Sequence, residues 1–561
     1  MNTPAPSGAD GHSRPRLKSL LPSRNDYRDL DRSWPRDLLA GLTVGVVALP
    51  LALAFGIASG VGAGPGLVTA VVAGAIAALF GGSHVQVSGP TGAMTVVLVP
   101  LVHSHGPAVV YPVAIVAGVM LVAAGVVGAG RLLAYVPWPL IEGFTVGIAV
   151  IIAAQQVPAA LGVTKPDADN AAWAAVLSVG RAFTQHQLAT FGVFALAALT
   201  MLVVSRVHRV LPAGLLAVIV ATVFAATTRI HVARIGHLPA GLPTPQVPPF
   251  GGLSGIVSAG LVVAFLGALE SALSATVADG MSDAPRHDTN RELLGQGLAN
   301  IASGLCGGVP ATGAIARTAV NVRAGARTRL AAFTHAVALT AVIYLAAGLI
   351  GRVPLAALAG VLIVTAARMV NLRTVRVLLR TTRADAAIFL ITAACTVSWD
   401  LVHAVAAGLV IAVVTTLARV SRNSGARPEA LTPAELGPTQ DLQLLQQHIL
   451  VYRLDGPLHF AVTTRFLTEM LSVADVSVVI LRTSGLGLLD ASGAKALGEI
   501  IAELRSRGIT VLVKGLSADQ ARVLEAVDAL RGVREHGLLF DNLGDAVNYA
   551  RGLIAGARTS G

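Results

Sequence analysis

The chain has 561 residues, of which 54% are hydrophobic and only 13% are charged, and its formal net charge at pH 7 is +11. This low charged fraction excludes an ordinary soluble protein and indicates that most of the chain lies in a membrane. The positive charge does not indicate nucleic-acid binding, because the basic residues fall in short loops between apolar runs, where they set membrane orientation.

The N-terminal segment, residues 1–36, is polar and basic, which excludes a cleaved signal peptide and predicts a cytoplasmic N-terminus. A membrane domain is expected over residues 37–420. Apolar runs in its first half lie near 37–60, 65–80, 90–103, 108–129, 139–157, 188–205 and 211–227. After the Pro-rich stretch 238–250, a second half repeats this rhythm near 254–278, 291–306, 311–322, 330–350, 354–367, 385–400 and 401–419. Several runs are too short for a complete crossing of about 20 residues, so broken segments are expected.

Arginines indicate the topology of this domain. With the N-terminus inside, the loops after even-numbered segments contain Arg131, Arg206, Arg209, Arg286, Arg291, Arg323, Arg327, Arg329, Arg368, Arg373, Arg376, Arg380 and Arg383. The loops assigned to the outside, residues 165–181 and 231–250, contain fewer charges. The pattern predicts an even number of segments and a cytoplasmic C-terminus, in a protein of the cell membrane.

Two interrupted stretches, Gly81–Ala93 and Gly307–Arg323, share a design in which a Gly-Gly pair precedes a proline and small residues. Non-helical backbone at membrane depth is tolerated only where protein or a water-filled cavity satisfies it, and the buried Arg317 needs a negative partner. Free amides at a helix N-terminus beside an arginine suit an anion, and matching interruptions in two halves indicate a transporter's binding site. The alternative is close helix packing through small residues, which leaves Arg317 and the prolines unexplained.

The composition changes after the membrane domain. Residues 421–447 are polar and read as a linker, and residues 448–555 are predicted to form a soluble domain. Its alternation of short apolar runs with one amphipathic run predicts strands and a helix, and hence a small α/β domain. The strands are expected at Ile449–Leu454, Val476–Leu481 and Thr510–Val513, and the helix at Ala491–Ser506.

Three stretches, Ala264–Ser271, Asn290–Asn300 and Gly307–Arg329, together resemble the sulfate permease (SulP) family of anion transporters, and the soluble domain resembles a STAS domain. The resemblance implies an α-helical polytopic fold of fourteen segments in a 7+7 inverted repeat, with a core domain, a gate domain and usually a homodimer. It also implies that an anion lies between the N-termini of two half-helices. The residues carried over as substrate-binding are Gln86, Gly89, Thr91, Gly92, Ala311, Thr312, Gly313, Ala314 and Arg317.

Glu270 is conspicuous because it lies mid-span after Leu261–Leu269. An intramembrane carboxylate must be paired, protonated or ion-bound, which marks a functional position. In similar family members with aspartate here and threonine four residues later, the pair looks like a sodium site for bicarbonate uptake. This chain has Glu270 and Ser274 instead, which favours protons as the coupling ion. A structural pair of Glu270 with Arg317 is the alternative, and it is compatible with coupling.

Other polar positions are less specific. Glu142 opens a span, and a carboxylate favoured by the helix dipole and a gating residue are equally good interpretations. In the STAS-like region Ser492 matches the serine that relatives present for phosphorylation, although Asp490 and Ser492 are also good helix N-caps. No metal, cofactor or enzyme activity is expected, since no ligand cluster appears, and His103, His105 and His335 are isolated and lack the spacing of metal ligands.

These observations predict secondary active transport of a small inorganic or organic anion, with sulfate first, driven by protons through an elevator-like movement of the core past the gate. Sodium-coupled bicarbonate uptake, proton-coupled dicarboxylate uptake and an uncoupled anion channel remain alternatives, because backbone amides and one arginine discriminate poorly among anions. A membrane-anchored receptor would instead require Ser492 to matter and transport to be absent. The expected partners are the anion, protons or sodium, the bilayer and a second copy, with no nucleic acid.

Overall fold

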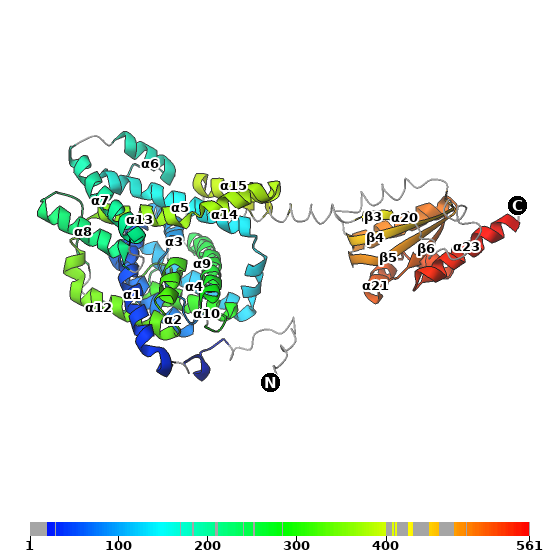
Figure 1. Ribbon diagram of the computed structural model, residues 1–561, viewed down its shortest axis with the longest axis horizontal. Coiled ribbons are helices and arrows are strands. Elements are labelled where there is room, and N and C mark those ends of the chain that lie inside the picture. Colours follow the sequence, from blue (N-terminus) through cyan, green and yellow to red (C-terminus); the bar gives the residue numbers. More distant parts are fainter. Residues whose placement is uncertain are drawn as a thin grey trace. The chain divides into compact units, whose positions relative to one another are not determined.

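The computed structural model describes residues 20–559 except 28–29, 169, 182–184, 208–210, 239–240, 251–252, 283, 400–406, 409, 412–413, 415–424, 430–447, 459–475 and 490. The chain divides into two compact units, Met1–Leu409 and Val410–Gly561 (Figure 1). Each unit has its own apolar core.

The first unit is helical, and eight of its described spans are long and apolar enough to cross a membrane. Short 3-10 turns lie at η2 (Arg24–Tyr27), η3 (Pro107–Val109) and η4 (Ala129–Tyr135). The helices before residue 230 are α1 (Leu30–Ala58), α2 (Ala63–Phe80), α3 (Gly92–His105), α4 (Val110–Val127), α5 (Trp138–Leu161), α6 (Ala171–Gly180), α7 (Gln185–Val207) and α8 (Ala213–Thr227). Those after it are α9 (Leu253–Met281), α10 (Thr289–Leu305), α11 (Ile315–Arg323), α12 (Arg329–Ile350), α13 (Leu355–Met369), α14 (Leu372–Thr381) and α15 (Arg383–Ser398).

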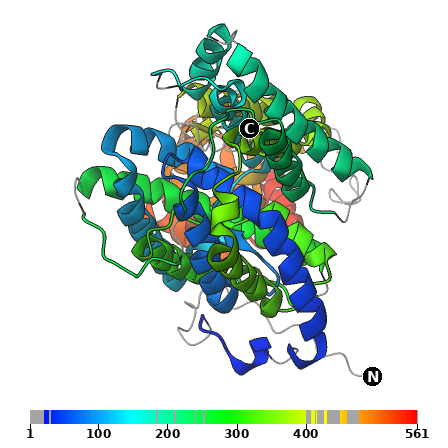
Figure 2. The same ribbon diagram turned by 90° about the vertical axis from the view of Figure 1, so that its left-hand side faces the viewer.

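These helices pack in two groups. The first group contains α1, α2, α4, α9, α10 and α12, and the second contains α5, α7, α13 and α15 (Figure 1). Small residues allow close packing: a Cβ on Gly118 of α4 would lie 2.6 Å from the Gly297 carbonyl oxygen of α10, and the reverse distance is also 2.6 Å. Figure 2 shows α1, in blue, extending from the N-terminal segment across the first unit.

The expected helix bounds need four corrections. The half-helices begin later than predicted, at Gly92 rather than residue 90 and at Ile315 rather than 311. The backbone of Thr91 and Ala314 is still extended, and Thr312–Gly313 form a strand. Two short helices, α6 and α14, lie in stretches that were assigned to loops. The expected run 401–419 falls largely outside the described residues.

The second unit is a five-stranded sheet of order β3-β4-β5-β6-β7 with helices packed against it. β3 (Gly425–Glu429) pairs antiparallel with β4 (Ile449–Leu458), while β5 (Val478–Leu489), β6 (Thr510–Lys514) and β7 (Leu539–Phe540) continue the sheet in parallel. The helices are α20 (Ala491–Ser506), α21 (Ala518–Ala526), α22 (Arg531–Glu535) and α23 (Leu543–Thr559). The prediction of a small α/β domain is confirmed, and the bounds of α20 agree with the expected helix.

Candidate functional site

Two short buried strands pair within the first unit, and we call their meeting point the strand crossing and the loops that carry them the crossing loops. β1 (Ser88–Gly89) and β2 (Thr312–Gly313) pair antiparallel, with Ser88 opposite Gly313 and Gly89 opposite Thr312. The backbone N–H of Ala314 extends the pairing by donating to the Val87 carbonyl at 2.9 Å. Because α3 follows β1 and α11 follows β2, the pairing brings the N-termini of two half-helices to one place.

Neither half-helix has a capping side chain. Thr91 precedes α3 and Ala314 precedes α11, and neither side chain accepts a hydrogen bond from the first-turn amides. The first amides of an α-helix have no acceptor within the helix, and they carry the positive end of its dipole. Both N-termini therefore offer free donors to an anion.

A cavity of about 510 Å³ lies beside these N-termini. Its first wall contains α1, α9 and the two half-helix starts, and its second wall contains α5, α7 and α13. The two walls therefore come from the two packing groups. Among the predicted site residues, those lining the cavity are Thr91, Gly92, Glu270, Gly313, Ala314 and Arg317.

Arg317, in the first turn of α11, is 1% exposed. Its Nη2 donates to the Pro90 carbonyl at 2.5 Å, and its Nη1 lies beside Gly89 without a hydrogen-bond partner. A side chain at Gly89 would collide with Nη1, so glycine makes room for the guanidinium. Among the described residues no ion pair joins Arg317 to Glu270, which leaves Nη1 as a buried donor at the site.

Glu270, on α9, accepts a hydrogen bond from Thr91 Oγ1 at 2.9 Å, so it contacts the start of α3. Its neighbour Ser271 bonds to Thr312 Oγ1 at 2.9 Å and accepts from the Gly313 amide at 3.0 Å. Ser274 is buried and bonds to Thr318 at 3.1 Å. The structure thus places Ser274 behind the site, and Ser271 is the serine that bonds to β2.

Four predicted binding residues lie outside the cavity lining. Gly89 and Thr312 form the strand pair, and Ala311 is held by Asn300, whose side-chain Oδ1 and Nδ2 bond the Ala311 amide and carbonyl at 2.8 Å each. The Gln86 amide is buried against Gly313, and neither its oxygen nor its nitrogen has a hydrogen-bond partner. These residues build the crossing rather than line the cavity.

Helices α2 and α10 hold the two crossing loops. Glu292 Oε2 accepts from the amides of Gly82 and Ser83 at 2.8 and 3.1 Å, and Gln296 donates to Ser88 Oγ at 2.5 Å. Thr69 of α2 bonds both backbone groups of Val309, at 2.7 and 3.1 Å. The stretch Asn290–Asn300 of α10, one of the three on which the family resemblance rests, therefore anchors these loops, a structural role that the sequence alone does not predict.

Arg368 is a cavity residue that the sequence did not predict as functional. It lies on α13 and lines the second wall, where it donates to Ser205 Oγ and to the Met201 carbonyl at 3.4 Å. The sequence predicts Arg368 only as one of the arginines in the cytoplasmic loops. Its position after a helical run with alanine neighbours gave no signal, because only packing against α7 turns it toward the cavity.

The remaining candidates lie elsewhere. Glu142 accepts a hydrogen bond from Trp138 Nε1 on the same helix at 3.1 Å. His335 is fully buried on α12, and neither ring nitrogen has a hydrogen-bond partner. Ser492 belongs to α20, and its side chain is outside the described part of the chain, as is Asp490.

Comparisons with known proteins agree with this architecture. Residues 35–392 match the model of the sulfate permease family, and residues 444–546 match that of the STAS domain. The protein YvdB of Bacillus subtilis is 35% identical over 507 residues, covering 88% of this chain and 93% of its own. The bicarbonate transporter BicA of Synechocystis is 31% identical over 541 residues, covering 92% and 94% respectively.

A solved structure shows the same fold. The murine Slc26a9 anion transporter in the inward-facing state superposes with a TM-score of 0.84 at 17% sequence identity, covering 97% of this chain and 96% of that one. The expected polytopic helical fold with a C-terminal STAS domain is thereby confirmed.

Proposed function

The chain belongs to the sulfate permease family, and we propose that it is a secondary active transporter of a small anion that binds between the N-termini of α3 and α11. The observation that carries this proposal is the meeting of two uncapped helix N-termini and the buried Arg317 at one cavity. Sulfate is the first candidate because of the family, and bicarbonate is the alternative because BicA is a relative.

Binding follows from charge and from donors. Arg317 lines the cavity and its Nη1 has no hydrogen-bond partner, while no side chain caps the first-turn amides of either half-helix, so an anion supplies the missing acceptor. Arg317 Nη2 stays bonded to Pro90, so the guanidinium is already oriented when the anion arrives. Arg368 on the opposite wall adds positive potential at the same cavity.

Glu270 supplies the coupling step in this proposal. Its carboxylate accepts from Thr91, the residue at which α3 begins, so its charge lies next to the bound anion. Two negative charges in one cavity repel each other, and a proton on Glu270 removes that repulsion. Anion and proton therefore favour each other's binding. A sodium ion beside the carboxylate and the Thr91 hydroxyl would act similarly, which keeps sodium-coupled bicarbonate uptake as the second candidate.

Movement of the first packing group past the second would carry the site across the bilayer, since the cavity lies between the two groups. This elevator-like step belongs to the proposal, together with a homodimer in the cell membrane and cytoplasmic termini. Cross-linking in membranes tests the dimer, and cysteine labelling from either side tests the position of the termini.

The coupling test uses proteoliposomes and the substitution Glu270→Gln, with Asp31→Asn, at an exposed carboxylate away from the cavity, as the control. We expect wild-type accumulation of labelled sulfate, bicarbonate or a dicarboxylate to follow an inward proton gradient. Glu270→Gln should still bind the anion and lose gradient-driven accumulation, while Asp31→Asn keeps it. Accumulation by wild type with a sodium gradient alone would replace the proton assignment, and equilibration without any gradient effect would indicate a channel.

A further inference from the structure

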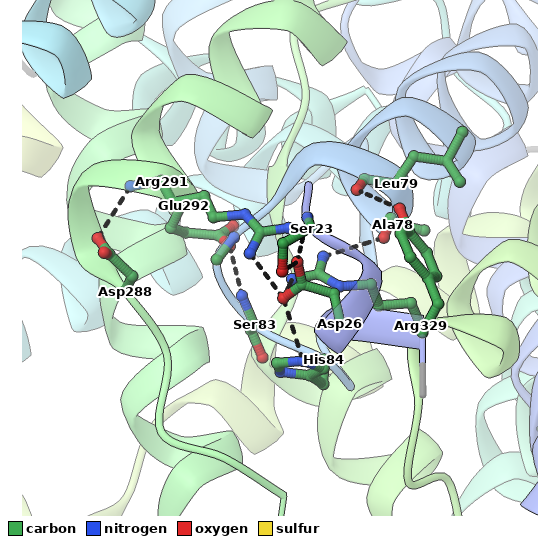
Figure 3. A network of polar contacts seen from close by, with 12 residues as sticks. Ser23, Asp26, Ala78, Leu79, Ser83, His84, Asp288, Arg291, Glu292 and Arg329 are labelled. Carbon is green, nitrogen blue, oxygen red and sulfur yellow. Dashed lines mark hydrogen bonds and ion pairs between the residues drawn. The ribbon is translucent and has the colours of Figure 1, made fainter. Parts of the chain in front are cut away.

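The short turn η2, which precedes the first membrane helix, contacts the helical unit mainly through the carboxylate of Asp26 (Figure 3). Asp26, on η2, accepts a hydrogen bond from Arg291 Nη1 at 2.7 Å. Arg329 Nη2 lies 3.9 Å and His84 Nε2 lies 3.7 Å from the same oxygen. Next to Asp26, the Tyr27 hydroxyl donates to the Leu79 carbonyl at 3.2 Å.

Asp26 is held in its ionised form. Burial alone raises its pKa, but the hydrogen bonds from Arg291 and from the backbone and hydroxyl of Ser23 outweigh burial, and the pKa lies well below its usual range. The pairing is shielded from water, because the side chains of Asp26 and Arg291 are only 10% and 9% exposed. Every ion pair that Arg291 and Arg329 make within the described residues goes to Asp26.

Arg291 stands directly before the residue that anchors the first crossing loop. Glu292 accepts from the Gly82 and Ser83 amides and from Gln296 Nε2 at 2.9 Å, and Gln296 also donates to Ser88. Ser88 in turn pairs with Gly313 across the strand crossing. A continuous set of contacts therefore joins Asp26 to β1 through the first two turns of α10. Figure 3 shows its first part, from Asp26 to Arg291 and from Glu292 to Ser83.

We propose that Asp26 is a positioning residue of the anion site, which fixes the first turn of α10 and thereby the loop that carries β1. The inference rests on the proposed anion site at α3 and α11. It makes η2 part of the structure that holds the anion site in place. Without the carboxylate, Arg291 and Arg329 lose the ion-pair partner that they share, and the negative charge left beside Arg329 is Glu292, which already accepts from the loop amides. The two arginines then repel each other more strongly, and α10 shifts to separate them.

The first experiment compares full-length Asp26→Asn with Asp31→Asn, which neutralises an exposed carboxylate a few residues later on α1. Hydrogen exchange is measured on peptides covering residues 81–89, without any anion. We expect Asp26→Asn to speed exchange there by about tenfold, because Glu292, which accepts from the Gly82 and Ser83 amides, is no longer held in a fixed position. Asp31→Asn should leave it unchanged. Unchanged exchange in Asp26→Asn would overturn the proposal, whatever the protein transports.

The second experiment measures anion affinity in a double-mutant cycle of Asp26→Asn with Ser88→Ala. If Asp26 acts through Gln296 and Ser88, each single variant weakens binding by about threefold or more, and the double variant is little weaker than the worse single one. If the losses of affinity in the two single variants multiply in the double variant, the two residues act independently and the route through Ser88 is wrong. Unchanged affinity in Asp26→Asn would overturn its positioning role.

Asp26→Glu keeps the charge and serves as the rescue variant. It should recover most of the protection of residues 81–89 and most of the affinity, and it also provides a folded comparison if Asp26→Asn is recovered in poor yield. Failure of Asp26→Glu to recover either quantity contradicts a role based on charge. Absence of anion binding in the wild type would refute the proposed function alone, because the exchange measurement needs no ligand.

Discussion

The two crossing loops that meet at the cavity, residues 81–91 before α3 and residues 306–314 before α11, share their geometry but differ in where the nearby buried charge lies. The first has an uncharged half-helix and an anchor made by the carboxylate of Glu292. The second has Arg317 in its half-helix and neutral anchors, which are Thr69, Asn300 and Ser303. Each anchor binds the backbone of the crossing loop.

This difference separates stability from binding. A charge in the anchor contributes to the fold because it satisfies buried amides, whereas a charge in the half-helix remains available to a ligand. The anchors also join the two halves: α10 of the second half anchors both loops, and Thr69 on α2 of the first half adds an anchor to the second loop. Substitutions at the charged anchor should therefore affect unfolding most, and those at the charged half-helix should affect affinity most.

The largest expected effect is the loss of the charged anchor. Glu292→Ala leaves the amides of Gly82 and Ser83 buried without an acceptor, which should lower the free energy of unfolding by about 3 to 5 kcal/mol. Denaturant unfolding in detergent measures it. Glu142→Ala, which loses one hydrogen bond from Trp138, is the control, and equal losses in the two variants would remove the distinction between the anchors.

Loss of the charged half-helix residue comes second. Arg317→Ala should weaken anion binding by about 1.5 to 3 kcal/mol, or roughly tenfold or more, because a charge-assisted donor disappears from a desolvated site. Calorimetric titration of the anion gives the value. Arg323→Ala, in the last turn of the same helix, is the control and should bind normally. Normal anion binding by Arg317→Ala would show that the guanidinium serves only to bond the Pro90 carbonyl.

Loss of a neutral anchor should lower the free energy of unfolding less than loss of Glu292. Thr69→Val keeps the shape of the side chain and removes the hydroxyl that bonds both backbone groups of Val309, for an expected loss of about 1 to 2 kcal/mol in unfolding free energy. Thr340→Val removes a hydroxyl that bonds only the Ala336 carbonyl of its own helix. A loss at Thr69 as large as that at Glu292 would show that charge is not what separates the anchors.

The smallest effect is expected from removal of the soluble domain. All residues named at the cavity and at both crossings belong to Met1–Leu409, so deletion of Leu442–Gly561 should leave the dissociation constant of the anion unchanged, although transport can slow. Binding to the purified truncated protein tests this. A well-folded truncated protein without affinity would show that the crossings depend on the second unit.

The sequence predicted the site to the extent that local chemistry decides it. The Gly and Pro punctuation located both interruptions, and Arg317 and Glu270 stood out as charges within apolar runs. Long-range contacts were beyond its reach: Glu292 and Gly82 are 210 positions apart, and nothing local in α10 shows that its carboxylate caps a distant loop. Pairing with β1 likewise converted Thr312 and Gly313 from expected helix to strand. Ser274 follows Glu270 by about one helical turn, a spacing that predicts that both face the site. Its hydroxyl bonds to Thr318 instead.

The opposite charges of Arg317 and Glu270 at one cavity have an electrical consequence. With Glu270 ionised they sum to zero, so in the proposed movement the empty site would carry no net charge across the bilayer, and its return would be insensitive to membrane voltage. Loaded with a monovalent anion alone, the same body moves one negative charge, which is worth about 2.3 kcal/mol per 100 mV. A proton on Glu270 cancels that charge. For a monovalent anion, this single proton would therefore decide whether transport produces a current, whereas a divalent anion such as sulfate would still carry one negative charge.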